Sequence, residues 1–345
     1  MTTHSQAAAG PTAEHGGGQE AGGHGGDAPG GHGGTRAIIA ALLANLGIAV
    51  SKFVAFLVTG ASSMLAEAIH SLADSGNQLL LLVGGRQAKR AATPQHPFGF
   101  GRDRYIYAFI VAIVLFSVGG LFAIYEGVHK LLHPEELTSP GWALGVLVVA
   151  ICLESFSLRT AVKETAAIKS RDDSYWQFIR HARSPELPVV LLEDVGALIG
   201  LVLALLGVGL ATITGNGVYD GLGTVAIGAL LVVIAVVLAI ETKSLLLGES
   251  ATPEDQRKIV AALEAGPDAV SVIHMKTLHL GPDEVLVAAK IAVSRADTAA
   301  DVAADIDAAE ARIRAAVPIA RLIYLEPDLR RPAEPGSGSS AAPRA

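Results

Sequence analysis

The chain has 345 residues, of which 51% are hydrophobic and 17% are charged. In a soluble domain about a quarter of the residues are usually charged, so this composition argues against an ordinary soluble protein. The one cysteine, Cys152, excludes an intrachain disulfide framework and a thiolate metal cluster. The net charge of −7 says less than the placement of the charges, and we expect neither a nucleic-acid partner nor a cleaved signal peptide.

Residues 1–35 are rich in Gly, Ala and His and contain almost nothing that could form a core. We expect this segment to be a disordered cytoplasmic tail. Its histidines are spaced roughly ten residues apart, which leaves two interpretations open: weak metal chelation, or a solvated linker without a role. These histidines are His4, His15, His24 and His32.

Six apolar segments follow, each near the ~20 residues with which a helix crosses a bilayer. The predicted fold class is therefore a polytopic α-helical membrane protein with six transmembrane helices, which occupy a membrane domain at 36–250. The six segments lie at 37–58, 64–85, 105–128, 141–162, 187–213 and 220–242.

Basic side chains gather in the second and fourth connections between these segments, whereas the other three connections together carry only Lys130. Because short cytoplasmic loops are enriched in Lys and Arg, we expect loops two and four and both termini to be cytoplasmic, in a multi-pass protein of the cell membrane. The fourth connection also predicts a short amphipathic helix with Trp176 and Phe178 at the membrane interface. The basic residues are Arg86, Lys89, Arg90, Arg102 and Arg104 in loop two, and Arg159, Lys163, Lys169, Arg171, Arg180 and Arg183 in loop four.

From 251 to 328 the pattern is that of a small cytoplasmic domain, and 329–345 reads as a second disordered tail. The pattern predicts a ferredoxin-like α+β domain with its helices on one face of a sheet. The predicted elements are a helix at 253–265, strands at 270–279 and 285–293, a helix at 298–316 and a strand at 319–325.

The second apolar segment contains Glu67, His70 and Asp74, although a charged side chain near the bilayer centre costs at least ~2.5–3.5 kcal/mol. His70 and Asp74 are four residues apart and lie one turn apart on one helix face. Glu67 precedes His70 by three residues, close to the same face, and is either a metal ligand or a group that orients His70. If the helix begins near residue 62, His70 and Asp74 lie roughly 12–18 Å deep.

The fifth apolar segment contains Glu193 and Asp194, about 10 Å into a helix that begins at 187. We therefore expect the two acidic helices to meet near the middle of the membrane. Imidazole and carboxylate ligands suit Zn²⁺, and also Mn²⁺, Fe²⁺ or Co²⁺. The alternative is that these side chains only form hydrogen bonds between helices.

Other polar residues in the apolar segments are open to more than one interpretation. Asn45 is a candidate ligand or a polar contact between helices. We expect Lys52 to extend outward to the membrane surface and Asp220 to cap the sixth helix. Glu154 is either a proton-relay group or a partner for a basic residue.

Two stretches, "AEAIHSLADSGNQ" and "HPFGFGRDRYIYAFIVAIVLFSVGGLFAIYEGVHKLLHP", together with six spans and a small C-terminal domain, resemble the cation diffusion facilitator family over about 36–328. The resemblance implies a homodimeric secondary transporter, not an enzyme. It would have no resident cofactor and would export Zn²⁺ or a similar ion from the cytoplasm in exchange for protons.

The chain departs from the family pattern in two places. The family usually has a second ligand four residues before the aspartate of span five, but that position is Val190 here. The resemblance therefore implies His70, Asp74 and Asp194 as ligands, with Glu193, Glu67, Asn45 or water to complete the set.

The second departure is in the C-terminal domain, where many relatives bind additional zinc. Here it offers only His274 and His279, and the other matching positions are Ala288, Tyr324 and Glu326. We expect this domain mainly to mediate dimerisation.

Four alternatives to zinc–proton exchange stay open at this point. They are an exporter of Mn²⁺, Co²⁺ or Fe²⁺, a membrane metal sensor without transport, a uniporter or channel, and an intramembrane metallohydrolase. The last would require a general base, and the HxxxD motif is not the HExxH of such enzymes.

Overall fold

The computed structural model describes residues 31–134, 137, 139–169, 174–265 and 271–329, with side chains from Asn45 onward. It divides into two compact units, 1–41 and 42–345, and the second contains the sites discussed below. His4, His15, His24 and residues 330–345 lie outside the described residues, and of His32 only the backbone is described. Residues 31–35, expected to end the tail, instead form the first turns of a helix.

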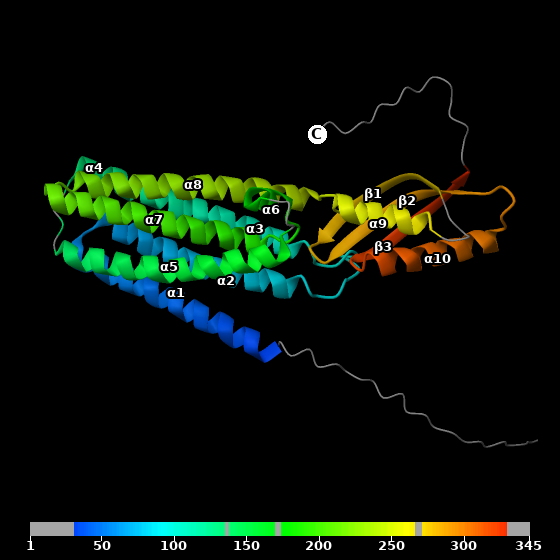
Figure 1. Cartoon of the computed structure of the whole chain (residues 1–345), viewed down its shortest axis with the longest axis horizontal. Coiled ribbons are helices and arrows are strands. Elements are labelled where there is room, and N and C mark those ends of the chain that lie inside the picture. The colour runs from blue at the N-terminus through cyan, green and yellow to red at the C-terminus, as the bar shows by residue number, and fades with distance from the viewer. Residues whose placement is uncertain (1–30, 135–136, 138, 170–173, 266–270, 330–345) are drawn as a thin grey trace, which may run out of the picture. The chain divides into compact units, whose positions relative to one another are not determined.

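Six long helical segments correspond to the six apolar stretches of the sequence (Figure 1). The third begins as α3, passes through a seven-residue π-helix, η1, and continues as α4. The segments are α1 (Gly31–Thr59), α2 (Ser62–Gln87), α3 (Asp103–Val114) with η1 (Leu115–Leu121) and α4 (Phe122–Leu132), α5 (Pro140–Ile168), α7 (Glu186–Thr214) and α8 (Val218–Leu247).

Four of these segments are long and apolar enough to cross a membrane: 103–132, α5, α7 and α8. Asn45–Thr59 of α1 is a shorter apolar helix. The 26 residues of α2 are sufficient in length, but Glu67, His70 and Asp74 make that helix more polar than the others. The structure thus has the helices of a membrane protein, and α2 is the most polar of the long helical segments described.

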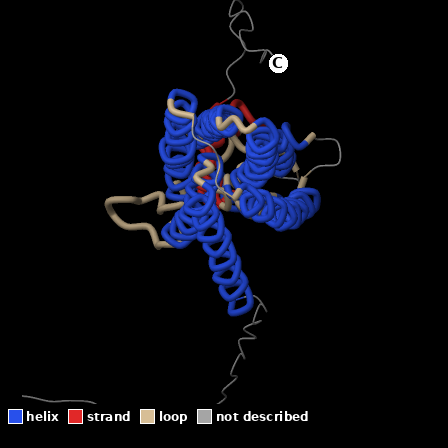
Figure 2. Tube along the Cα trace, turned by 90° about the vertical axis from the view of Figure 1, so that its left-hand side faces the viewer, coloured by secondary structure: helices blue, strands red, loops and turns tan. Residues whose placement is uncertain are grey.

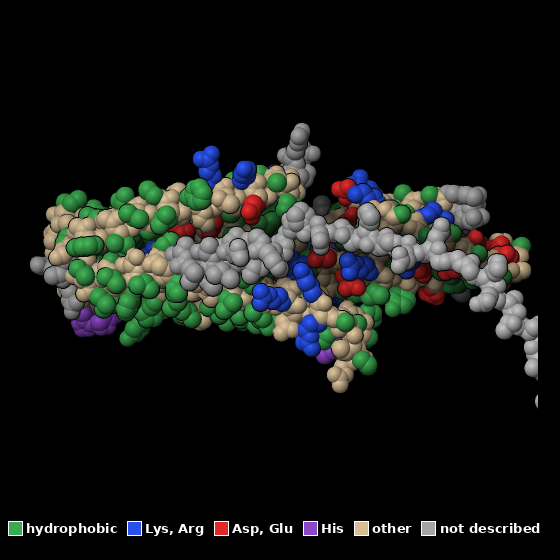
Figure 3. All heavy atoms as spheres, turned by 90° about the horizontal axis from the view of Figure 1, so that it is seen from below, with side chains coloured by type: hydrophobic (Ala, Val, Ile, Leu, Met, Phe, Trp, Pro, Cys, Tyr) green, Lys and Arg blue, Asp and Glu red, His purple; other side chains and the backbone are tan. Residues whose placement is uncertain are grey.

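The helices α2, α3, α4, α5, α7 and α8 lie side by side, as the end-on view in Figure 2 shows. Many large apolar side chains point outward from them, including Leu57, Phe156 and Ile213, which are 66%, 74% and 83% exposed. Figure 3 shows hydrophobic side chains over much of the visible surface of these helices. Such an extensive apolar exterior is expected of a surface that faces lipid.

Glycines allow α4 and α8 to pack with their backbones in direct contact. A Cβ atom on Gly127 would lie 2.7 Å from the backbone nitrogen of Val225, and one on Gly228 would lie 2.7 Å from that of Ile124. Small residues at helix crossings are a common basis of packing within membranes, where burial of apolar surface contributes little. The third and sixth spans are therefore a closely packed pair.

Asp220 does not cap its own helix as the sequence analysis expected. It is fully buried in the first turn of α8 and accepts hydrogen bonds from the backbone of Ser62 at 2.8 Å and of Ser63 at 3.3 Å. Both serine hydroxyl groups also donate to it. Since these backbone groups belong to the first turn of α2, Asp220 caps α2 and links its N-terminal end to α8.

A short helix in the fourth connection, α6 (Tyr175–His181), was predicted and is present. Ser174 and Gln177 form a reciprocal capping box at its start. Trp176 is 51% exposed, whereas Ile179 is buried. The helix is therefore amphipathic.

The C-terminal elements are α9 (Pro253–Leu263), β1 (Ser271–Gly281), β2 (Glu284–Val293), α10 (Ala299–Ala316) and β3 (Ala320–Leu329). The sheet has the order β1-β2-β3, with β1 antiparallel and β3 parallel to β2. Alternate residues of β2, such as Val287 and Ile291, are buried against Ile259 and Ile313 of the two helices. The described residues thus form a small α+β layer but lack the first strand of a complete ferredoxin-like pattern.

Candidate functional site

A small acidic cavity of about 20 Å³ lies among four of the long helices. Its volume is sufficient for a single water-sized occupant. Four carboxylates line it, which is the kind of wall that favours a cation. The lining residues are Asn45 and Ile48 of α1, Ser71, Asp74 and Gln78 of α2, Glu154 and Ser157 of α5, and Val190, Glu193 and Asp194 of α7.

The spacing of these residues along each helix explains why they share one cavity. On α2, Asp74 follows Ser71 by three residues and Gln78 follows Asp74 by four. On α7, Glu193 follows Val190 by three residues and Asp194 follows it by four. The polar face of α2 therefore meets Glu193 and Asp194 of α7, so the two acidic helices come together as expected. Glu154 and Ser157 add a third helix, which the sequence analysis had not placed at the site.

Two of the carboxylates are held by amide or hydroxyl donors. Asn77 Nδ2 donates to Glu193 Oε1 at 2.7 Å, and both side chains are buried. Ser157 Oγ donates to Asp194 Oδ2 at 3.1 Å. These bonds connect α2 to α7 and α5 to α7 at the cavity and fix the directions in which the carboxylates point.

His70 lies beside the cavity but does not line it. Its side chain is 1% exposed, and its Nδ1 lies 3.5 Å from Asp74 Oδ1. Among the described residues neither ring nitrogen has a hydrogen-bond partner, and neither has Asp74 Oδ1. Because leaving such groups buried and unsatisfied costs about 1–3 kcal/mol each, the pair has unused capacity to bind a ligand.

In the part of the chain that the structure describes, no group of three or more His, Cys, Asp or Glu side chains lies close enough together to hold a metal ion. The predicted set of His70, Asp74 and Asp194 is thus brought to one region but not assembled. Asn45 and Glu193 line the same cavity, and Glu67 does not. The assignment of these six residues as ligands stays a prediction.

Lys52 was expected to extend to the membrane surface, and this was wrong. The side chain is 0% exposed, and its Nζ lies 3.0 Å from Glu67 Oε2 and 2.7 Å from Ser71 Oγ. A charge buried in an apolar bundle requires a partner of opposite charge, and Glu67 supplies it. Glu67 therefore pairs with Lys52 and has no contact that would orient His70.

Three residues near the cavity were not predicted from the sequence: Asn77, Ser157 and, as a buried group, Lys52. The helical spacing of each to a cavity residue could have indicated its position. Asn77 follows Asp74 by three residues and His70 by seven, and Ser157 follows Glu154 by three, so each lies on the acidic face of its helix. Lys52 follows Asn45 by seven residues, which places it on the same face of α1 as that cavity residue.

The histidines of the C-terminal sheet do not form a metal site among the described residues. His274 is exposed and pairs in register with Lys290, whose ammonium group lies 3.0 Å from Glu326. His279 is 1% exposed, and its Nδ1 lies 3.1 Å from the carbonyl oxygen of Gly281. Burial lowers the pKa of His279 below its usual value.

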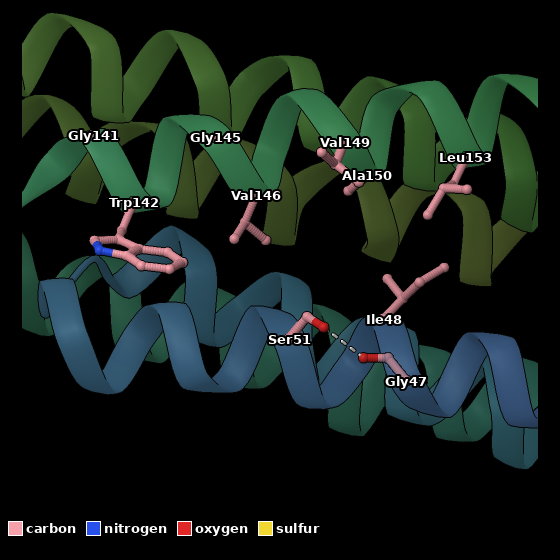
Figure 4. Close-up of a pocket in the computed structure, with 10 residues that line it drawn as sticks. All are labelled: Gly47, Ile48, Ser51, Gly141, Trp142, Gly145, Val146, Val149, Ala150 and Leu153. Carbon is pink, nitrogen blue, oxygen red and sulfur yellow. Dashed lines mark hydrogen bonds between the residues drawn. The ribbon is translucent and has the colours of Figure 1, made fainter.

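A second, apolar cavity of about 750 Å³ lies between α1 and α5. Figure 4 shows Ile48 of α1 and Leu153 of α5 pointing toward one another at one end, with Trp142 at the other. Ile48 also lines the acidic cavity. A single isoleucine side chain thus borders both spaces.

The family model for the cation efflux transmembrane domain matches residues 38–247, which include all six long helices apart from the first turns of α1. The chain belongs to this cation efflux, or cation diffusion facilitator, family. The acidic cavity of this cation efflux protein lies entirely inside the matched region.

Several relatives match about 70% of the chain or more. It is 34% identical over 241 residues to the mitochondrial proton-coupled zinc antiporter SLC30A9 of Mus musculus, covering 70% of this chain and 42% of that protein. It is 27% identical over 257 residues to metal tolerance protein C4 of Arabidopsis thaliana, covering 74% and 56%. It is 27% identical over 247 residues to the cation-efflux pump FieF of Serratia proteamaculans, covering 71% and 76%. The chain spans less than half the length of the antiporter.

Proposed function

We propose that this cation efflux protein exports a divalent metal cation, Zn²⁺ in the first instance, from the cytoplasm in exchange for protons. The observation that carries the proposal is the cavity where Asp74, Glu193 and Asp194 converge with Glu154 inside a cation efflux domain. The names of the relatives, a proton-coupled zinc antiporter and a cation-efflux pump, support the same reading.

The chemistry of these side chains by itself accounts for the exchange of a metal ion for protons. A metal ion binds carboxylates only when they are deprotonated and His70 only when it is neutral, so metal and protons compete for the same groups. Asn77, which is buried, and Ser157 each donate a hydrogen bond that holds one of the carboxylates in place. A metal ion released on the far side is replaced by protons there.

The proposal includes the topology inferred from the sequence. All six long helices span the membrane, both termini face the cytoplasm, and the protein is a homodimer of the cell membrane. The even number of spans and the basic second and fourth loops support this arrangement.

The test is metal flux into proteoliposomes that contain the full chain. Zn²⁺, Mn²⁺, Co²⁺ and Fe²⁺ are compared while the internal pH is followed. Zn²⁺ flux coupled to proton movement supports the proposal, whereas faster flux of another of these metals would identify that metal as the substrate. Metal binding without flux would indicate a sensor, and flux without proton movement would indicate a uniporter or channel.

A further inference from the structure

Lys52 is a positively charged side chain buried next to a site that has to attract positive ions. Its ammonium group lies between the Glu67 carboxylate, at 3.0 Å, and the Ser71 hydroxyl group, at 2.7 Å, and it is completely shielded from solvent. If the only role of this lysine were to join α1 to α2, an uncharged pair would suffice, since replacing a buried ion pair by apolar residues is often neutral or stabilising.

The position of the ammonium group relative to the acidic cavity gives it a second role. Ser71, which accepts its hydrogen bond, lines the cavity, and Asp74 follows Ser71 on the same face of α2 after about 4.5 Å of helix rise. On α1, Ile48 precedes Lys52 by one turn and also lines the cavity. The positive end of the Lys52–Glu67 pair therefore faces the cavity.

The negative end is directed away from the cavity. Glu67 Oε1 lies against α7 at Gly200, where a Cβ atom would be only 2.6 Å from that oxygen. Glycine at position 200 leaves the space that the carboxylate occupies, and Glu67 does not line the cavity. The pair thus has a fixed direction, from Gly200 of α7 toward the acidic cavity.

We propose that Lys52 is a resident cation of the transport site, which Glu67 holds at Ser71 and which weakens the binding of the divalent metal ion. Four carboxylates line the cavity of about 20 Å³, and a fixed positive charge beside them lowers the affinity of the site for a divalent cation. The inference rests on the proposed function, because it concerns the affinity of the same site for its cargo.

The proposal predicts opposite effects from two changes. Glu67→Gln removes the counter-ion of Lys52 and frees the ammonium group to approach Asp74. The uncompensated positive charge beside the cavity should weaken Zn²⁺ binding about tenfold. Lys52→Met with Glu67→Gln removes the positive charge together with its counter-ion and should strengthen Zn²⁺ binding about tenfold. In transport, the double variant should show a lower KM and a lower kcat, because release becomes slower.

The experiment is Zn²⁺ titration of the full chain in detergent, with binding to an Asp74→Ala/Asp194→Ala variant subtracted as background. Lys52→Gln with Glu67→Gln is a second version of the double variant, in which two amides replace the ion pair. Lys130→Met is the matched control, because Lys130 is also a buried lysine but donates to the carbonyl oxygen of Gly60, 3.2 Å away, and does not line the cavity. This control should leave Zn²⁺ binding unchanged.

Unchanged affinity in Glu67→Gln and in both double variants, or changes in the same direction, would overturn the proposal and leave Lys52 as a packing residue. Failure of the proposed function has a different signature. In that case the wild-type chain binds Zn²⁺ above background, and the variants differ as expected, but proteoliposomes show no flux. Absence of wild-type binding above background would overturn both.

Discussion

Nδ2 of Asn77 lies 2.7 Å from Oε1 of Glu193, and this buried hydrogen bond joins α2 to α7 beside the acidic cavity. One oxygen of Glu193 is therefore committed to Asn77, and the carboxylate as a whole is held at the cavity wall. Val190, one turn earlier on α7, lines the same cavity. Val190, where the chain departs from the family pattern, thus faces the site together with Glu193.

Replacing Glu193 by Gln keeps the shape of the side chain and removes its charge. We expect metal binding to weaken about 10–100-fold, the range seen when a partner of metal ligands is removed. Zn²⁺ titration in detergent measures this directly. A larger loss would identify Glu193 as a direct ligand, whereas unchanged affinity would show that the carboxylate plays no part in metal binding.

Val190→His should add an imidazole to the cavity and shift transport toward Zn²⁺ relative to Mn²⁺, because a closed tetrahedral site with imidazole suits Zn²⁺. The flux ratio of the two metals in proteoliposomes is the measurement. Val190→Leu is the matched control, since it adds volume without a ligand atom. An unchanged ratio in Val190→His would place residue 190 out of reach of the metal.

Asp74→Ala and Asp194→Ala should each abolish metal flux while the protein still folds and reaches the membrane. The two carboxylates approach the cavity from different helices, and removing either eliminates an anionic ligand. Ser157→Ala, which removes only the hydroxyl group that donates to Asp194, serves as the comparison and should reduce flux modestly. Wild-type flux from a folded Asp194→Ala protein would exclude Asp194 from the site.

Gly228→Leu should destabilise the helix bundle by about 1–3 kcal/mol, the usual cost of overpacking. A Cβ atom at this position meets the backbone of Ile124 at 2.7 Å. Gly209→Leu on α7 is the control, because no atom lies within 4 Å of a Cβ atom there. Thermal unfolding in detergent compares the two, and equal midpoints would contradict the close contact between α4 and α8.

His279 should make the C-terminal sheet less stable in acid. Burial lowers the pKa of its imidazole in the folded chain, so below about pH 6.5 the unfolded state binds the additional proton. Stability therefore rises with pH up to about 6.5 and falls as the pH drops below it. Hydrogen exchange of amides in 271–281, measured across this range, should show the loss.

In His279→Gln this acid dependence should be reduced, whereas in His274→Gln it should be retained because His274 is exposed. Arg183 and Asp255 are the other charged groups whose fields reach His279. Identical pH profiles in the wild type and His279→Gln would show that His279 is not the source of the acid sensitivity.

The predicted positions of the helices and strands agree with the structure to within a few residues for most elements. An apolar run of about 20 residues, or an alternation of buried and exposed residues as in β2, can be recognised from the sequence of the segment alone. The same is true of the acidic face of α2, because Asp74 shares that face with Ser71 and Gln78 at three- and four-residue spacing. The largest disagreement is at the start of α1, where a Gly/His-rich composition suggested a tail.

The residues that pair with one another across different helices could not be predicted from local sequence patterns. Lys52 and Glu67 are 15 residues apart, Asn77 and Glu193 are 116 apart, and Ser62 and Asp220 are 158 apart. In a helix that is apolar on nearly every side, local periodicity does not determine how the helix is rotated toward its neighbours. The sequence by itself thus determined which helices carry the charged groups and where along each helix those groups sit. Only the tertiary structure decided that Lys52 turns inward and that Asp220 caps α2, because a buried charge takes whichever partner the packing of distant helices brings within reach.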